Sequence, residues 1–254
     1  MQAADATALP TMPLLGVDVV SATGADVMQA IASMIAARTG QHVAFINANN
    51  ANIAVKNPTF KAALDKALVL PDGIGVDIGA RLLHGVAYAE NLNGTDFVPA
   101  LLKQLPAGTK VGLYGAAPGT AKRAKAVIDD MAPALDTRVI AHGFARGQDQ
   151  AEALEGLEEW QADVLLVAMG TPYQEIWIDR HITSEHSAVV LSVGALFDFL
   201  AGNVKRAPEW MRRARCEWMF RLAQEPTRLW QRYVIGNPRF LLHVITAKLR
   251  GAKG

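Results

Sequence analysis

The sequence predicts an α/β protein with a Rossmann-like, doubly wound and mainly parallel sheet, followed by a basic helical appendage. Six short apolar runs are nearly continuous in Val, Leu, Ile and Ala, which is typical of strands buried on both faces of a parallel sheet. Segments with helical periodicity separate these runs, and this alternation indicates helices on both faces of the sheet. Hydrophobic residues make up 51% of the 254 residues, enough for one large core.

The first expected helix is amphipathic and spans residues 26–38. It places Val27 and Ile31 on one face, and Gly40 is a plausible stop signal. The strands are expected at residues 42–46, 67–70, 110–114, 138–141, 163–169 and 188–193, and two further helices at 121–131 and 150–160. We divide the chain into a flexible leader (1–13), the α/β domain (14–202) and the appendage (203–254).

Glycine and polar residues gather at the expected carboxyl ends of these strands, the edge at which open α/β sheets bind ligands. Glycine lets the backbone approach a ligand closely, and amide groups at helix starts attract phosphate. One such glycine is explained by a tight turn, whereas five positions together favour a shared ligand edge. These positions are the Pro71-Asp72-Gly73 segment, Gly115, Gly143, Gly170 and Gly194.

Asp72 is the candidate for chemistry at this edge. It directly follows an apolar strand, where a partly desolvated carboxylate could act as a general base toward a hydroxyl nucleophile. The alternative is that Asp72 caps the helix that follows.

Other polar side chains at the edge also have a binding and a structural interpretation. Asn47 and Asn49 could hydrogen-bond a sugar or a nucleotide, or they could serve only the turn after the strand. Residues 170–175 offer a helix start, where an acidic side chain also stabilises the positive end of the helix dipole. The binding candidates in this segment are Gly170, Thr171, Gln174 and Glu175.

The sequence lacks the motifs of several common classes of disulfide, metal, cofactor-binding and catalytic site. The single cysteine, Cys216, excludes an internal disulfide and is typical of a reducing cytoplasm, and the six histidines show no metal-ligand spacing. There is no dinucleotide-binding glycine fingerprint, phosphate-binding loop, nucleophile elbow or Asp-x-Asp pair. We therefore expect a reaction without metal or cofactor, in which arginine neutralises a departing diphosphate.

No stretch of the sequence approaches the roughly 18 apolar residues that a membrane-spanning helix needs. The N-terminus also has no basic region ahead of an apolar run, so we expect no secretory signal.

The appendage differs from the rest of the chain in charge. It contains 12 Lys and Arg against 3 Glu, whereas the first 202 residues contain 13 Lys and Arg against 21 Asp and Glu, which suggests an anionic partner for the appendage. Helices are expected at 209–224, 226–235 and 239–250, broken by Pro226 and Pro238, with Trp and Arg interleaved. This composition suits an anionic membrane surface. Alternatively the helices only cover the α/β domain. Nucleic-acid binding is disfavoured because no known module is present.

Four segments in this order resemble the WecG/TagA/CpsF family of glycosyltransferases. They are 70–76 (Leu-Pro-Asp-Gly-Ile-Gly-Val), 167–175 (Val-Ala-Met-Gly-Thr-Pro-Tyr-Gln-Glu), 202–208 (Gly-Asn-Val-Lys-Arg-Ala-Pro) and 217–226, which contains Glu-Trp, Arg-Leu and Glu-Pro. Residues 46–48 and 93–96 are also similar to the family pattern, and the resemblance spans residues 43–240.

The resemblance implies an inverting, metal-independent transfer from a UDP-sugar to an undecaprenyl-diphosphate-linked sugar in surface polysaccharide synthesis. The donor sugar would be a hexose, N-acetylmannosamine or a uronic acid. The protein would be peripheral on the inner face of the cytoplasmic membrane, and a homo-oligomer is plausible. Asp72 would be the base, and the expected substrate contacts include Asn47, Gln174, Thr95 and Asp96. The appendage would hold the diphosphate through Arg206, Arg221, Arg228 and Arg232.

Three departures from the family pattern are visible in the sequence. Phe45 stands where the family often has Thr, and Asn91 stands near the position where it usually has Arg, so a hydroxyl and a positive charge are missing. The usual Gly-Leu-Glu-Trp reads Arg-Cys-Glu-Trp at residues 215–218. These departures affect the expected donor more than the expected reaction. They leave a non-catalytic, nucleotide-binding membrane adaptor as the alternative.

Overall fold

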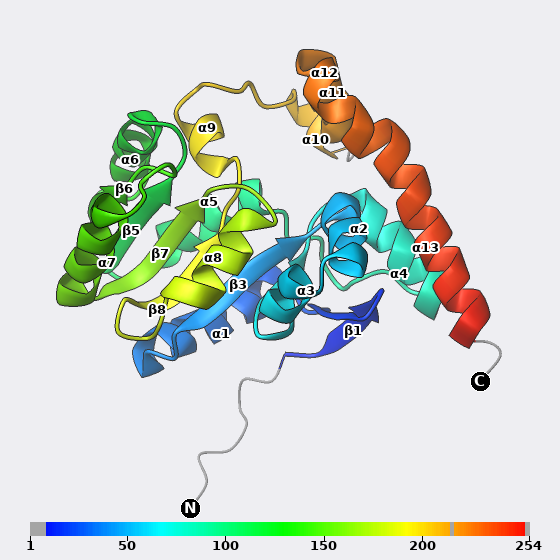
Figure 1. Cartoon of the computed structure of the whole chain (residues 1–254), viewed down its shortest axis with the longest axis horizontal. Coiled ribbons are helices and arrows are strands. Elements are labelled where there is room, and N and C mark those ends of the chain that lie inside the picture. The colour runs from blue at the N-terminus through cyan, green and yellow to red at the C-terminus, as the bar shows by residue number, and fades with distance from the viewer. Residues whose placement is uncertain (1–8, 214–215, 252–254) are drawn as a thin grey trace, which may run out of the picture.

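The computed structural model describes residues 9–213 and 216–251, and one eight-stranded sheet forms the centre of this part of the chain (Figure 1). Its strands are β1 (Thr11–Leu14), β2 (Val17–Val20), β3 (Gln41–Ile46), β4 (Leu68–Pro71), β5 (Lys110–Gly115), β6 (Asp136–Ala141), β7 (Ala162–Ala168) and β8 (Ser187–Ser192). Their order is β1-β2-β4-β3-β8-β7-β5-β6, and all neighbours are parallel except β1 and β2. The predicted α/β fold is confirmed, and the six predicted strands correspond to β3 through β8.

Helices cover both faces of this sheet (Figure 1). Those before the C-terminal segment are α1 (Gly24–Ala37), α2 (Ala48–Lys56), α3 (Pro58–Asp65), α4 (Ile74–His84), α5 (Gly94–Gln104), α6 (Thr120–Met131), α7 (Gln148–Trp160), α8 (Tyr173–His181) and α9 (Leu196–Leu200). Side chains of α1, α5 and α6 share one hydrophobic cluster with the sheet, and those of α7 and α8 share another. The predicted helices therefore belong to a doubly wound arrangement.

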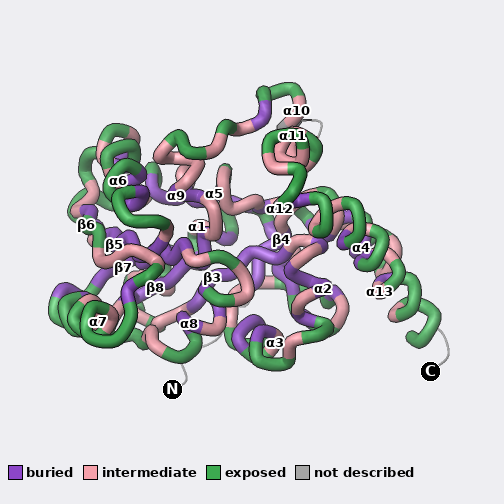
Figure 2. The backbone as a smooth tube through the Cα atoms, turned by 45° about the horizontal axis from the view of Figure 1, so that its top comes forward, coloured by how far each residue is buried: buried purple, intermediate pink, exposed green. Residues whose placement is uncertain are grey.

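Strand β3 shows why the apolar runs are continuous. Val43 and Phe45 belong to the cluster on one face of the sheet, and Ala44 and Ile46 belong to the cluster on the other. Because side chains alternate along a strand, both faces must be apolar when helices cover both. The central strands are accordingly buried between more exposed helices (Figure 2).

The sequence also explains both ends of α1. Thr23 Oγ1 accepts a hydrogen bond from Asp26 N–H, and the Asp26 carboxylate accepts one from Thr23 N–H, each at 3.2 Å, which forms a capping box. Val27 and Ile31 are fully buried, as predicted. The helix ends at Ala37, and Arg38 caps it in the left-handed conformation, with φ of 46°, two residues before the expected stop at Gly40.

Strands β1 and β2 were not predicted. They form an antiparallel hairpin whose two turn residues, Leu15 and Gly16, both have positive φ. The predicted leader, residues 1–13, therefore overlaps the sheet, because β1 begins at Thr11. The remainder of that prediction, residues 1–8, lies outside the described residues.

The C-terminal segment consists of α10 (Glu209–Arg213), α11 (Glu217–Gln224), α12 (Pro226–Trp230), a π-helical turn η1 (Gln231–Ile235) and α13 (Gly236–Gly251). Pro226 begins a new helix, as predicted. Pro238 does not break the chain: helical structure continues through it from η1 into α13, and the π-helical turn directly before it is the irregularity. The loop that follows α9 leads across the top of the molecule to α10–α12, and α13 then runs down beside α2 and α4, both of which it contacts (Figure 1).

Phe240 anchors α13 to the α/β domain. Its side chain is 1% exposed, and a Cβ added to Gly79 would lie only 2.7 Å from Phe240 Cζ, so α13 approaches α4 closely at this glycine. We expect Phe240→Ala to lower the free energy of unfolding by about 3–5 kcal/mol, measured by urea denaturation, because it leaves a cavity in a closed contact. Leu242→Ala is the control: this side chain is on the same helix but 63% exposed, so little change is expected. Equal effects of the two variants would contradict this anchoring role.

Candidate active site

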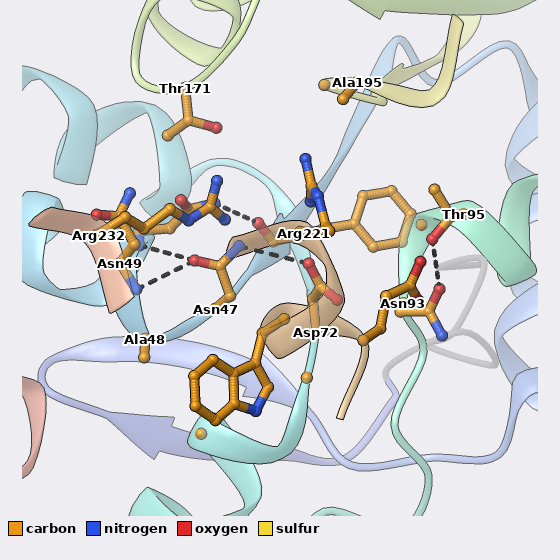
Figure 3. Close-up of a pocket in the computed structure, with 18 of the residues that line it drawn as sticks. Asn47, Ala48, Asn49, Asp72, Asn93, Thr95, Thr171, Ala195, Arg221 and Arg232 are labelled. Carbon is orange, nitrogen blue, oxygen red and sulfur yellow. Dashed lines mark hydrogen bonds between the residues drawn. The ribbon is translucent and has the colours of Figure 1, made fainter. Parts of the chain in front are cut away.

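A cavity of about 660 Å³ opens at the carboxyl ends of β4, β3, β8 and β7, four strands that are adjacent in the sheet. Asp72 follows β4, Asn47 follows β3, and Gly170 and Gly194 follow β7 and β8. Arg221 of α11 and Arg232 of η1 reach the same cavity from the C-terminal segment, and Figure 3 shows them near Asn47 and Asp72. The site is therefore built from the sheet edge on one side and the appendage on the other.

The Asp72 carboxylate has a raised pKa. Burial is the main cause, while a hydrogen bond from Asn47 and the charges of Arg232 and Arg221 act in the opposite direction. Asn47 Nδ2 donates to Asp72 Oδ2 at 3.4 Å, and Asp72 N–H donates to Ile46 O at 2.8 Å. A carboxylate in this environment is suited to accept a proton from a bound hydroxyl group.

Asn47 both caps helix α2 and donates a hydrogen bond to Asp72 in the cavity. As the N-cap of α2, its Oδ1 accepts hydrogen bonds from the N–H groups of Asn49 and Asn50, both at 3.1 Å. This cap holds the amide in one orientation, with Nδ2 directed at Asp72 (Figure 3). The side chain of Asn49 also lines the cavity.

Gln174 joins the ends of β7 and β8 beneath the cavity. Its side chain is 2% exposed, and Oε1 accepts from the N–H groups of Gly170 at 3.1 Å and Gly194 at 3.2 Å. Its Nε2 donates to Glu175 Oε1 at 2.8 Å, and Thr171 Oγ1 donates to the same oxygen at 2.8 Å. These bonds hold the cavity wall in shape.

Glu175 does not line the cavity. It is buried behind Gln174 and Thr171, and burial raises the pKa of its carboxyl group. The structure thus supports neither a substrate contact nor an exposed helix-start charge for this residue.

Arg221 and Arg232 are the two cations that line the cavity in the described part of the chain. Neither has a carboxylate within ion-pair distance among the residues the structure describes. The Arg221 guanidinium lies 5.2 Å from the ring centre of Phe199, and Arg232 Nε is buried with no hydrogen-bond partner there. Two unpaired guanidinium groups near Asp72 can bind an anionic group.

Arg206 was predicted to join these arginines, but the structure pairs it with carboxylates. Its guanidinium lies 2.7 Å from Asp96 Oδ1 and 3.4 Å from Glu217 Oε2, and it does not line the cavity. It therefore links the start of α5 to α11, rather than facing a diphosphate. Arg228 lies on α12, and its side chain is outside the described residues.

Thr95 and Asp96 line the cavity where α5 begins. Thr95 Oγ1 donates to Asn93 Oδ1 at 2.9 Å, and Asp96 pairs with Arg206. Both side chains are near enough to meet a ligand, although each also has a structural partner.

Two of the predicted edge glycines, Gly115 and Gly143, lie outside this cavity. A Cβ at Gly115 would be 2.3 Å from Ala168 O, and one at Gly143 would be 3.1 Å from Ala116 N. Close backbone packing beside β5 accounts for both glycines.

Comparison with known proteins shows the family of the chain. Residues 12–254 match the model of the glycosyl transferase WecG/TagA/CpsF family. The chain belongs to this family. It is therefore a glycosyltransferase.

Several curated relatives carry the same name, N-acetylglucosaminyldiphosphoundecaprenol N-acetyl-beta-D-mannosaminyltransferase. The protein from Bacillus spizizenii is 32% identical over 83% of this chain and 82% of its own length. The one from Bacillus subtilis is 30% identical over 82% and 80%, and one from Staphylococcus aureus is 26% identical over 82% of each.

Two departures from the family pattern have structural roles in this glycosyltransferase. Phe45 packs edge-on against Phe97, with ring centres 6.2 Å apart, and lines the cavity with an apolar surface. Asn91 lines the cavity and binds the backbone of Gly73.

Other cavity residues were given no role of their own from the sequence, among them Asn50, Asn93 and Ser192. Asn93 could have been found, because an Asn directly before a Gly-Thr-Asp helix start is a typical N-cap. Ser192 ends β8, and its Oγ lies 2.5 Å from Nε2 of His42, a buried contact across 150 residues that no local signal reveals.

Within residues 9–213 and 216–251, no helix combines the length and apolar character needed to cross a membrane. Over the same residues, no three His, Cys, Asp or Glu side chains are grouped so as to hold a metal ion.

Proposed function

We propose that this glycosyltransferase moves N-acetylmannosamine from its UDP derivative to N-acetylglucosamine carried on undecaprenyl diphosphate. The acceptor and the transferred sugar are those in the names of relatives that are 32% and 30% identical over about four-fifths of the chain. The observation that carries the proposal is the placement of one carboxylate of raised pKa, Asp72, in a cavity with two unpaired arginines.

The chemistry follows from these groups. Asp72 takes the proton of the attacking acceptor hydroxyl while that oxygen bonds to the anomeric carbon of the donor sugar. The bond from the anomeric carbon to the diphosphate oxygen breaks, and the electron pair stays on UDP. Arg221 and Arg232 neutralise the charge that develops on the diphosphate, so that no metal is needed. Attack from the side opposite the departing diphosphate inverts the anomeric centre.

We infer that the protein works as a peripheral protein on the inner face of the cytoplasmic membrane. Large hydrophobic side chains of the appendage are exposed among its Lys and Arg residues, and such a surface suits an anionic lipid interface. They are Trp210, Met219, Trp230, Val234, Ile235, Leu242, Ile245 and Leu249. A homo-oligomer would be a second way to cover this surface.

A transfer assay tests the proposal. We expect purified protein to release UDP and form a disaccharide product, identified by mass, when given UDP-N-acetylmannosamine and N-acetylglucosaminyl polyprenyl diphosphate. UDP-glucose, UDP-N-acetylglucosamine and UDP-N-acetylmannosaminuronate serve as competing donors. Exclusive use of another donor would replace the proposed sugar. Absence of both UDP binding and transfer across the panel would overturn the proposed reaction.

A further inference from the structure

Residues 90–93 form a strap that lies beside the Asp72 segment. The Glu90 carboxylate accepts a hydrogen bond from Gly24 N–H at 2.7 Å, which ties the strap to the start of α1. Leu92 N–H donates to Pro71 O at 2.8 Å, and Asn93 caps α5 by accepting from Asp96 N–H at 3.0 Å. The strap is therefore fixed to three elements of the α/β domain.

Asn91 connects the strap to Gly73, the residue after Asp72. Its Oδ1 accepts from Gly73 N–H at 2.9 Å, and its Nδ2 donates to Gly73 O at 3.0 Å, so one amide satisfies both backbone groups of one residue. The same Nδ2 lies 3.4 Å from Asp77 Oδ2, one turn into α4. The two hydrogens of Nδ2 allow both contacts.

The pairing with Asn91 holds Gly73 in an unusual conformation. Gly73 has φ +87°, and a Cβ there would meet nothing within 4 Å, so the backbone angle rather than space calls for glycine. On the other side of the carboxylate, Asp72 N–H is bound to Ile46 O on β3. The backbone is thus held on both sides of the Asp72 side chain, by β3 and by Asn91.

We propose that Asn91 is a positioning residue, which fixes the Asp72 carboxylate where it can reach the acceptor hydroxyl. The inference rests on the proposed role of Asp72 as the base. The family pattern has Arg near this position. In this chain Asn91 instead binds the backbone of Gly73, next to the proposed base, and adds no charge to the cavity.

Replacement of Asn91 by Ala tests the inference. We expect Asn91→Ala to lower kcat by roughly 10- to 100-fold, because a small displacement of a reacting group is costly, while KM for donor and acceptor changes less than about threefold. The acid limb of the pH profile should move, because the burial of Asp72 changes with its position. The control is Asn57→Ala, which removes an N-cap acceptor of Phe60 N–H at 3.0 Å from α3, away from the cavity.

Asn91→Asp is the second variant, and its kinetics decide the test if Asn91→Ala does not fold. It keeps an acceptor for Gly73 N–H but loses the donor to Gly73 O, and it places a second carboxylate beside Asp77. We expect a lower kcat and an acid limb at higher pH, because the added negative charge opposes ionisation of Asp72.

The outcomes separate this inference from the proposed function. An active wild type with unchanged kcat and pH profile in both variants would overturn the positioning role alone. A loss in Asn91→Ala that matches Asn57→Ala, with the pH profile unchanged, would also overturn it, since a general loss of folded protein predicts that pattern. A wild type without transfer activity would contradict the proposed function itself.

Discussion

Asp72→Asn is expected to lower kcat by about 100- to 10,000-fold, the range that general-base catalysis contributes. The amide keeps the size of the side chain and can still accept a hydrogen bond from Asn47, so the fold and the cavity should be retained. Binding of UDP, measured by calorimetry, should change little, because the base acts on the acceptor. Asp65→Asn is the matched control, since Asp65 pairs with Lys61 on the surface of α3. A kcat within a few-fold of wild type would exclude Asp72 as the base.

The raised pKa of Asp72 adds a pH signature to this prediction. The base must be ionised, so the rate should rise with pH through the pKa of Asp72 and be lost as the pH falls below it. Because burial raises this pKa above the ordinary 3.8, the acid limb of kcat/KM should lie above that value. A limb at or below 3.8 would contradict the assignment.

Arg221→Ala and Arg232→Ala are each expected to lower kcat by roughly 100- to 1000-fold, because a charge that stabilises the departing diphosphate is removed. Lysine at either position should recover part of the rate, since it restores the charge without the two-pronged geometry. Arg232→Ala should also raise the pKa of Asp72 further and move the acid limb to higher pH, because the Arg232 charge lowers that pKa.

Arg138→Ala provides the control for the two arginine variants. Arg138 also stacks on an aromatic ring, 4.5 Å from the centre of Trp160, but lies on β6 away from the cavity. Its kcat should equal that of wild type. If the alanine variants of Arg221 and Arg232 changed only KM for the donor, the two residues would bind the ground state rather than stabilise the departing charge.

The fold could be predicted from the sequence because the central strands are buried on both faces of the sheet. Strand β7 is apolar at every position but one, and β3 and β8 each contain four consecutive apolar residues, so these strands stood out as continuous runs. The β1–β2 hairpin did not, because its strands have four residues each and its turn is Leu-Gly, a weaker signal than Asn-Gly. The appendage helix α13 was found, but its burial against Gly79 through Phe240 was not, since that contact depends on three-dimensional packing.

Part of the site could also be predicted from the sequence, because two of its residues directly follow predicted strands. Asp72 and Asn47 follow strands directly, so the parallel topology alone brings them to one edge. The ion pair of Arg206 could not be predicted from the sequence, because its partner Asp96 is 110 residues away in the chain. Asn91 was seen only as a lost charge, because its bonds to Gly73 depend on how the chain folds back across 18 residues.

The two halves of the cavity are made at different times during synthesis. Asp72 and Asn47 leave the ribosome early, whereas Arg221 and Arg232 come from α11 and η1, and α13, which anchors them, comes last. In the proposed mechanism, a nascent chain that has completed its sheet would have the base without the cations that stabilise UDP as it leaves. In the proposed mechanism, transfer would therefore begin only when α13 has docked on α4. A cut in the segment that follows Arg206 would leave the link between the base and its arginines to the packing of Phe240 against Gly79.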